Sequence, residues 1–457
     1  MRPQRRWVVA FALSMAFDGA PATQQAMAIP VGDPEGLPVK KRVVERHGIE
    51  WTFDRACVVG EFCNGDPWVL GPVRIVAISP QCAVVDGRVV NGSMVDPDPS
   101  TEAQGFDSHG YGEGTGDRYV ARLNVARDVS KQRPLRLLPG QSLVSVASRK
   151  QAKDPPVLRS AAVLTRVAER PAPDAFRPPY VKGDKAVQHR AADLDFRVLR
   201  RLRPVGDLPL IEAVAARFER LWLDTAPAWV TRYMHPLENM PDYGRDIGAL
   251  VGSAGLMLNL DLPKARKREL LVRFVQLGID NHAKLRAGCR WRGLGGHGHG
   301  RKLPILVAGA VLHDEQMLAI GREFVSKPKQ AGGDGGYFAE DAETFYVERT
   351  GDDEWNWGYG NYTARDEGLP EWGFAHADSP ERDDASWEGN PYRRCCTANA
   401  WAAQCLTARV MGLVDAWHHP AWFDYVDRYQ QVEHTEAWHR SWVDWHAKMW
   451  AAYRPNY

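Results

Sequence analysis

In residues 264–285, KARKRELLVRFVQLGIDNHAKL, apolar side chains recur at i, i+3 and i+4, which is the period of an amphipathic helix. The same spacing recurs on both sides of this stretch. It predicts helices over residues 208–224, 247–260, 264–285, 303–312, 316–325, 397–413, 421–429 and 436–450. Helices joined by loops in this way predict an α/α barrel or an incomplete toroid, in which the loops at one end line a long cleft.

Nearer the amino terminus the pattern changes to short apolar runs bounded by Gly, Pro, Asn and Asp, which is typical of β-strands. Strands are predicted over residues 68–70, 73–78, 83–85, 88–90, 142–147 and 161–164, with Asp86-Gly87 as a hairpin turn. The proline-rich residues 171–185 indicate a boundary. We therefore expect a mainly helical α+β protein, with a β-rich domain or lid (a small sandwich or sheet) over residues 29–175 and a helical domain over residues 176–457.

Residues 1–28 have the features of a secretory signal peptide: Arg2, Arg5 and Arg6 precede a short apolar run and small residues suited to cleavage. That run is too short to cross a bilayer. The expected protein is secreted or periplasmic and has no membrane partner. A formal net charge of +1 gives no overall attraction to nucleic acid.

The 7 cysteines are odd in number, so at least one thiol is expected to be unpaired. Export permits disulfides, and Cys57 with Cys63 or Cys82 is the simplest pairing. The adjacent Cys395 and Cys396 are interpreted as small buried side chains at the start of a helix.

The strongest candidate for chemistry is the loop GGHGHGRK, residues 295–302, which leads into an apolar helix. Its glycines leave the backbone free to adopt positive φ, and its arginine and lysine suit an anionic ligand. Imidazole has the side-chain pKa closest to neutrality. His297 is the first choice for a base or carboxylate-neutralising group and His299 the second. The alternative is a solvated glycine-rich entry to a helix.

Further short motifs accompany this loop: VGEFCNGDPW (59–68), GPV (71–73), YGR (243–245), FVQLGID (274–280), LPEWG (369–373) and YRRCCT (392–397). Together they resemble exported bacterial α/α-barrel polysaccharide lyases of the alginate and glucuronan type, nearest to polysaccharide lyase family 38. The resemblance implies β-elimination in an acidic polysaccharide without a cofactor. A His/Tyr acid–base pair would act while Arg, Asn or His neutralises the uronate carboxylate.

Carried onto this chain, the resemblance gives His297, Tyr346, His299 and Tyr359 as catalytic candidates, with Tyr362 also competing for the tyrosine role. The substrate-binding candidates are Arg301, Asn239, Tyr243, Arg245, Trp372 and Arg393. Tyr243 is a further candidate for the catalytic tyrosine. We expect His297→Ala to abolish turnover and Arg301→Ala mainly to weaken binding. No metal is expected.

Three alternatives remain at this point. A glycoside hydrolase would use two carboxyl groups from the set Glu340, Asp341, Glu343, Asp353, Glu354 and Glu371. A metal site would combine His297 and His299 with a distant acid such as Asp280. A non-catalytic exported protein would bind glycans through tryptophans near polar loops, namely Trp291, Trp355, Trp357, Trp372 and Trp387.

Overall fold

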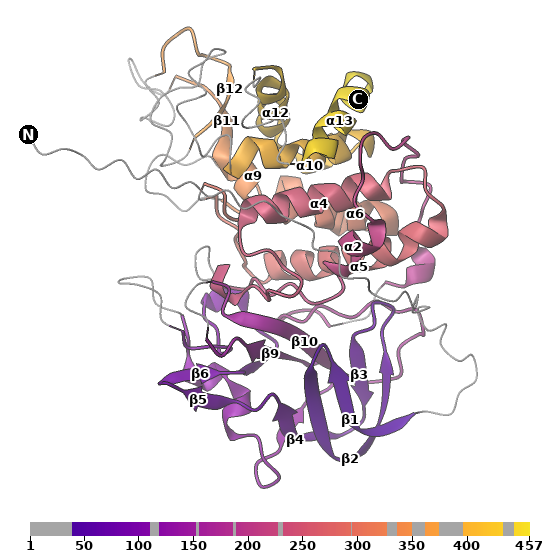
Figure 1. Ribbon diagram of the computed structural model, residues 1–457, viewed down its shortest axis with the longest axis vertical. Coiled ribbons are helices and arrows are strands. Elements are labelled where there is room, and N and C mark those ends of the chain that lie inside the picture. Colours follow the sequence, from indigo (N-terminus) through magenta and orange to yellow (C-terminus); the bar gives the residue numbers. More distant parts are fainter. Residues whose placement is uncertain are drawn as a thin grey trace, which may run out of the picture.

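The chain has a β-rich amino-terminal part and a helical carboxy-terminal part (Figure 1). The computed structural model describes residues 39–109, 118–151, 155–185, 189–226, 232–293, 295–326, 336–349, 362–373, 396–432 and 443–457. It is 37% helical and 21% strand. The mixed α+β class and the β-rich amino-terminal part are therefore confirmed. The predicted signal peptide lies outside the described residues.

Most of the strands belong to one curled sheet that resembles half of a barrel. The strands are β1 (Lys40–Arg46), β2 (Ile49–Glu61), β3 (Pro67–Leu70), β4 (Val73–Ser79), β5 (Ala83–Val85), β6 (Arg88–Val90), β7 (Ser93–Val95), β8 (Leu135–Leu137), β9 (Ser142–Ser148), β10 (Leu158–Val167), β11 (Thr344–Tyr346) and β12 (Pro370–Trp372). The main sheet has the order β7-β9-β10-β3-β2-β4-β8, with β1 paired to β2. The predicted strands are present. Those over residues 68–70, 73–78, 142–147 and 161–164 belong to the curled sheet, whereas β5 and β6 form a separate two-stranded sheet, and the described strands do not form the expected sandwich.

The predicted hairpin at Asp86-Gly87 connects β5 and β6, whose residues Val85 and Arg88 face each other across the turn. Asp86 and Gly87 have φ angles of 49° and 79°. Positive φ at both central residues is the geometry of a type I′ turn, which matches the twist of the flanking strands. The local sequence signal was therefore sufficient here.

Strands β9 and β10 are buried almost throughout because apolar groups cover both faces of the sheet at this point. One face packs within the sheet's own core, around Trp51, Phe53 and Ile75. The other face carries Val144 and Val163, which pack in a cluster with Leu221, Leu223 and Met234. The sheet thus supports the segment that contributes one wall of the site described below.

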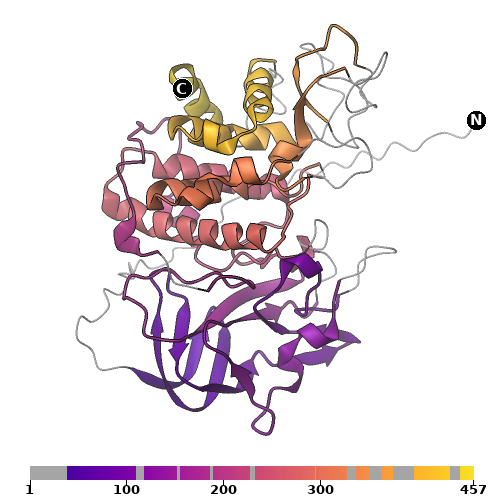
Figure 2. The same ribbon diagram turned by 180° about the vertical axis from the view of Figure 1, so that it is seen from behind.

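The helices form layers on one side of the sheet (Figures 1 and 2). They are α2 (Ile211–Ala216), α4 (Gly244–Leu258), α5 (Lys264–Arg286), α6 (Lys302–Leu312), α7 (Glu315–Leu318), α8 (Ile320–Glu323), α9 (Ala339–Glu343), α10 (Ala398–Val410), α11 (Val414–Trp417), α12 (Pro420–Val432) and α13 (Asp444–Tyr453). Helices α4, α5 and α6 lie between the sheet and the layer that contains α10, α12 and α13.

The described helices do not show the expected α/α barrel. A barrel needs successive antiparallel pairs of similar length, whereas two of the predicted helices are much shorter in the structure. The helix predicted over residues 208–224 is reduced to α2, and the one predicted over residues 316–325 is divided into α7 and α8. Apolar periodicity marks a buried face, and it does not ensure that the backbone stays helical along the whole stretch.

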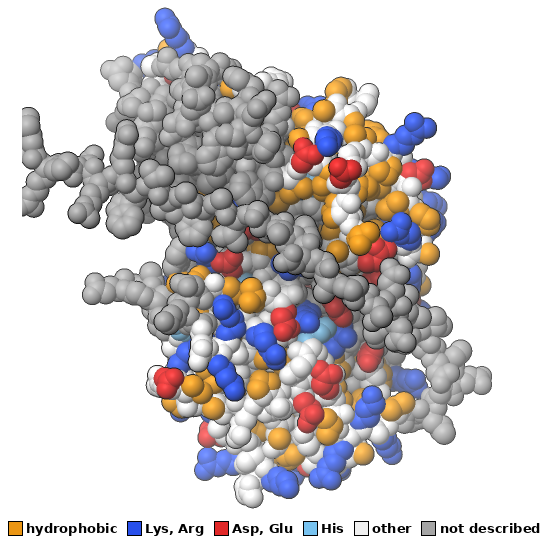
Figure 3. Space-filling model, in the orientation of Figure 1, with side chains coloured by type: hydrophobic (Ala, Val, Ile, Leu, Met, Phe, Trp, Pro, Cys, Tyr) orange, Lys and Arg blue, Asp and Glu red, His pale blue; other side chains and the backbone are white. Residues whose placement is uncertain are grey.

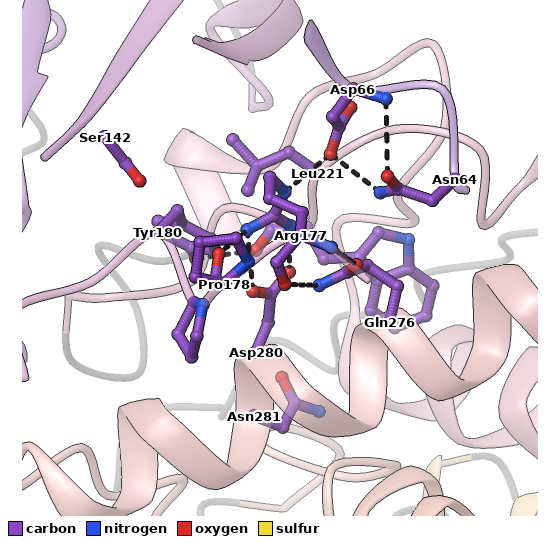
Figure 4. Close-up of polar contacts among 12 residues, drawn as sticks. Asn64, Asp66, Ser142, Arg177, Pro178, Tyr180, Leu221, Gln276, Asp280 and Asn281 are labelled. Atoms are coloured by element: carbon purple, nitrogen blue, oxygen red, sulfur yellow. Dashed lines mark hydrogen bonds and ion pairs between the residues drawn. The ribbon is translucent and has the colours of Figure 1, made fainter. Parts of the chain in front are cut away.

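A buried ion-pair network joins the sheet to the helical layer (Figure 4). Arg177 donates from Nε to Asp66, which follows β2, at 2.6 Å, and from two nitrogens to Asp280 on α5 at 3.0 and 2.5 Å. Its backbone N–H and C=O both bond to the Gln276 side chain. The proline-rich segment predicted as a boundary is therefore packed between the two parts, and residues 175–178 are buried.

The cysteines do not follow the predicted pairing. Cys57, Cys63 and Cys82 are free thiols. All three lie in the β-rich part, where a hydrophobic core already holds the strands together. Cys396 is buried just before α10, as interpreted from the sequence, and it is disulfide-bonded. Among the described residues, no helix is long and apolar enough to cross a membrane.

Candidate functional site

The loop over residues 295–301 leads into α6 and lies against the amino-terminal end of α4. Close approach requires glycine on both sides of this contact. A Cβ at Gly244 would lie 2.2 Å from the carbonyl oxygen of Gly296, and a Cβ at Gly296 would lie 2.4 Å from the Tyr243 hydroxyl. The two glycines thus allow Tyr243 and the histidine loop to touch.

The loop backbone also uses the positive φ angles expected from its composition. Gly298 has a φ of 81°, and a Cβ there would lie 2.7 Å from the carbonyl oxygen of Arg292. Neither the conformation nor the space admits another residue. The positive φ angles expected from the glycines are thus present at Gly295, Gly298 and Gly300.

A small pocket lies beside the loop and collects basic side chains from four segments. It is lined by Ala226, Arg232, His235, Asp242, Gly244, Arg290, Trp291, Arg292, His297, Gly298 and Arg301. Its volume is about 20 Å³, which is room for one water molecule. Arg232 and Arg292 keep 28% and 35% of their side chains exposed at its rim, so these long side chains can move to admit a larger ligand. Four guanidinium groups line the pocket. Three of them already pair with carboxylates: Arg232 with Asp242, Arg292 with Glu102 and Arg301 with Asp224. Guanidinium groups in this number make the pocket a candidate for binding an anion.

His297 contributes a buried imidazole to this pocket. Burial lowers its pKa to about 4, and the nearby guanidinium groups of Arg232 and Arg301 act in the same direction. The ring is therefore neutral at neutral pH. It packs edge-on against the ring of Tyr243, with centroids 4.7 Å apart and an interplanar angle of 86°. The structure thus brings the first-choice histidine into contact with one of the competing tyrosines.

Tyr243 lies between two guanidinium groups. Arg232 and Arg245 lie over its ring at 5.6 and 5.5 Å from the centroid. Arg245 also donates to Asp246 at 2.9 Å. Tyr243 thus combines a ring contact to His297 with two nearby guanidinium groups.

His235 is a pocket residue that the sequence analysis missed. Its Nδ1 lies 2.8 Å from the carbonyl oxygen of Pro241, which can only accept, so Nδ1 carries the proton. Burial, together with Arg301, lowers the pKa of His235 to about 3. The neutral ring therefore presents an unprotonated Nε2, which has no hydrogen-bond partner among the described residues. No motif surrounds His235 in the sequence, and its role depends on contacts with distant segments.

A buried carboxylate, that of Asp224, holds the Arg301 guanidinium in place. Asp224 accepts from Arg301 Nε at 3.0 Å and from Trp291 Nε1 at 3.1 Å through one oxygen, and from Lys284 Nζ at 2.5 Å through the other. Although burial opposes ionisation, Lys284 and Arg301 lower the pKa of Asp224. Arg301 is itself buried and also donates to the carbonyl oxygen of His299 at 2.5 Å. It lines the pocket as predicted, but it is also part of the folded core.

His299 has a structural environment. The Trp401 indole, which can only donate, lies 3.2 Å from His299 Nδ1, so the neutral ring carries its proton on Nε2. That nitrogen lies 3.2 Å from Glu343. Burial lowers the pKa of His299 to about 3. The side chain is fully buried and does not line the pocket, so the second-choice histidine supports the loop from beneath.

Glu340 lies beneath the same loop and provides a test by pH. Its Oε1 accepts from the Gly300 N–H at 2.6 Å, and its Oε2 has no hydrogen-bond partner within the described part of the chain. Burial raises its pKa from 4.5 to about 7. Because the folded pKa exceeds the unfolded one, Glu340 contributes stability that is fully present below pH 4.5 and is lost as the pH rises to about 7.

We therefore expect the Glu340→Gln variant to become more stable relative to the wild type as the pH rises from 4.5 to about 7, because only the wild type has to ionise a buried carboxyl group. The amide has a similar shape and cannot ionise. Urea denaturation across this pH range measures the difference. A difference between variant and wild type that does not change with pH would contradict the expectation.

The remaining candidates lie elsewhere. The Tyr346 hydroxyl donates to Asp424 on α12 at 2.5 Å, and burial together with Asp424 raises the pKa of Tyr346. A phenol held on a carboxylate is a poor proton donor to substrate, so the geometry gives Tyr346 no catalytic role. Tyr362 packs in a small cluster with Phe345. Tyr359 and Arg393 lie outside the described residues.

Two predicted substrate-binding residues are buried instead. Trp372 is fully buried and donates from its indole to Glu343 at 3.2 Å. Asn239 is also fully buried, and its amide donates to the backbone carbonyls of Arg220 and Leu221 at 3.2 and 3.4 Å. Both positions are corrected from substrate contacts to core residues, because apolar packing and backbone hydrogen bonds engage them.

The alternative metal site loses its third ligand, since Asp280 is engaged by Arg177. The described residues contain no group of three or more His, Cys, Asp or Glu side chains that could hold a metal ion.

On the face shown in Figure 3, basic and acidic side chains are interspersed over the β-rich part.

Comparison with known proteins adds no relative to this picture: no family model, no curated protein and no solved structure matches the chain.

Proposed function

We propose that this protein is a polysaccharide lyase that cleaves a uronate-containing polymer, of the alginate or glucuronan kind, by β-elimination at the basic pocket. One observation carries the proposal. A neutral imidazole, His297, contacts a tyrosine that lies between two guanidinium groups, and Arg301 lines the same pocket. These are the groups that β-elimination next to a carboxylate requires.

The chemistry explains each requirement. The proton on C5 is weakly acidic while the neighbouring carboxylate carries a full negative charge. Guanidinium groups that pair with this carboxylate stabilise the additional charge as the proton leaves, and preorganised donors of this kind contribute about 3 to 4 kcal/mol each. A base takes the C5 proton, the C5–H electrons form the C4–C5 double bond, and the C4–O4 bond breaks. The leaving oxygen then takes a proton from an acid.

Tyr243 fits the acid better than the other tyrosines. Its ring contacts His297 and two arginines, whereas the Tyr346 hydroxyl is held by Asp424. A phenol near cations can release its proton to the leaving oxygen and regain it afterwards. Tyr243, placed among the binding residues by the sequence, is therefore proposed as the catalytic tyrosine.

Three further features belong to the same proposal. The likeness to α/α-barrel lyases, and with it a helical catalytic domain over residues 176–457, is proposed from the sequence motifs alone. Export from the cell by a signal peptide over residues 1–28 is proposed from the sequence pattern alone. The proposed partner is an acidic polysaccharide, and the proposed reaction uses no cofactor.

The first test is a panel of uronate polymers, read by the near-ultraviolet absorbance of the conjugated double bond. We expect His297→Ala to lower kcat by about 100-fold or more while the fold is retained, since the imidazole lines the pocket and packs edge-on against the Tyr243 ring. Circular dichroism checks the fold. A variant with near wild-type turnover would contradict a catalytic role for His297.

The same assay separates the alternatives. New reducing ends without the double bond would indicate a glycoside hydrolase, and saturable binding without any new ends would indicate a glycan-binding protein. The hydrolase alternative has less support from the geometry. Glu340 and Glu343 are fully buried beneath the loop and do not line the pocket.

A further inference from the structure

His235 differs from the other buried histidines around the loop in what its two ring nitrogens contact. Its Nδ1 is committed to the backbone carbonyl of Pro241 at 2.8 Å, which fixes both the tautomer and the ring orientation. Its Nε2 has no hydrogen-bond partner among the described residues, although the side chain is only 3% exposed and lines the pocket. A buried, oriented and unoccupied acceptor in an anion-binding pocket is the arrangement of a general base.

We propose that His235 Nε2 is the base that takes the proton from the substrate carbon, a role that rests on the lyase function proposed above. A backbone carbonyl holds the ring in place, so no second side chain has to move during the reaction. His297 then remains beside Tyr243 and contacts the substrate carboxylate. The two imidazoles of the pocket thus have different tasks.

The charges around His235 explain why it would accept a proton only when substrate is bound. Burial is the main reason that its pKa is low in the empty pocket, and Arg301 and His297 act in the same direction while Asp224 opposes them. The other charged groups that line the pocket are Arg232, Asp242, Arg290 and Arg292. A uronate carboxylate among these guanidinium groups offsets their charge, and it therefore raises the proton affinity of His235 as it brings the carbon acid close.

Protons balance over the cycle. His235 gains the C5 proton and becomes an imidazolium, while Tyr243 gives its phenolic proton to the leaving oxygen and becomes a phenolate. Transfer of one proton from the imidazolium to the phenolate through solvent restores both groups. No oxidant, metal or other reactant is required.

The first experiment compares His235→Gln with wild type on a uronate polymer. The Gln carbonyl oxygen can accept a hydrogen bond near the position of Nε2 but cannot take a proton. We expect kcat to fall about 100- to 10,000-fold while KM changes by less than about threefold. His313→Asn serves as the matched control. His313 caps the carboxy-terminal end of α6 with a left-handed φ of 54°, which Asn tolerates, and its side chain does not line the pocket. A His235→Gln variant that retains a third or more of the wild-type kcat overturns the proposal.

The second experiment does not depend on turnover. Imidazole ¹⁵N NMR of the whole protein should show His235 as the Nδ1–H tautomer, and sodium glucuronate should raise the pH at which this ring is protonated by about one unit or more. No change on addition of glucuronate also overturns the proposal. If glucuronate produces the shift but no uronate polymer is cleaved, the lyase function fails while proton uptake at His235 stands. If polymer is cleaved equally by His235→Gln, the lyase function stands and His235 is not its base.

Discussion

Replacement of Tyr243 by phenylalanine is expected to lower kcat on a uronate polymer by about 100- to 10,000-fold, the usual contribution of a positioned acid or base. The change removes only the hydroxyl. The ring stays available to pack against His297 and beneath the guanidinium groups of Arg232 and Arg245. Substrate binding and the free energy of unfolding should therefore change little, so the loss appears in kcat and not in KM.

Tyr346→Phe is the matched comparison, because the sequence analysis also names Tyr346 as a candidate for the catalytic tyrosine. Its hydroxyl contacts Asp424 on α12, and β11 carries it in a small sheet with β12. We expect this variant to keep kcat within about threefold of wild type. The opposite pattern, with activity lost in Tyr346→Phe and kept in Tyr243→Phe, would return the catalytic role to Tyr346.

The largest expected effect on stability is at Asp224. Asp224→Ala would leave Lys284 and Arg301 as buried cations without their shared carboxylate, and it would also remove the acceptor of the Trp291 indole. Removing one partner of a buried ion pair costs about 3 to 5 kcal/mol. We expect a loss of this size in the free energy of unfolding, measured by denaturant titration at neutral pH.

An exposed pair provides the control for Asp224. Asp261 bonds to Arg201 at 2.8 Å with much of both side chains in solvent. Asp261→Ala should cost about 0 to 1 kcal/mol, which is the range for surface ion pairs. If the two aspartate variants lose equal stability, Asp224 does not have the central role that its contacts indicate. The same contacts change the expectation for Arg301→Ala, which should destabilise the fold as well as weaken binding.

Part of the site could be predicted because its signal is local. The loop over residues 295–302 combines glycines, imidazoles and cations within eight positions of sequence, and both His297 and Arg301 line the pocket. His299 belongs to the same loop, yet its side chain is buried against Trp401 and Glu343. The sequence could not separate the two histidines, because the direction of each side chain depends on the positive φ of Gly298 between them.

The rest of the site depends on contacts between distant segments. Asp224 meets Lys284 and Arg301 across 60 and 77 positions of sequence. His235 becomes a candidate base only because the Pro241 carbonyl holds one nitrogen while the other lies against the pocket. Trp372 and Asn239 look suited to a ligand in isolation, but burial places both in the core. No local sequence pattern predicts such burial.

The sequence by itself determined the mixed α+β class, the positions of most strands and helices, the hairpin at Asp86-Gly87 and the loop that carries His297. Turn residues and apolar periodicity act over a few neighbouring positions, so they can be recognised without the fold. The tertiary structure decided that most of the strands form one curled sheet, and it decided which tyrosine and which imidazoles lie together at the pocket. These outcomes follow from long-range packing and from the cost of burying charge without a partner, which depend on every segment that comes together at the site.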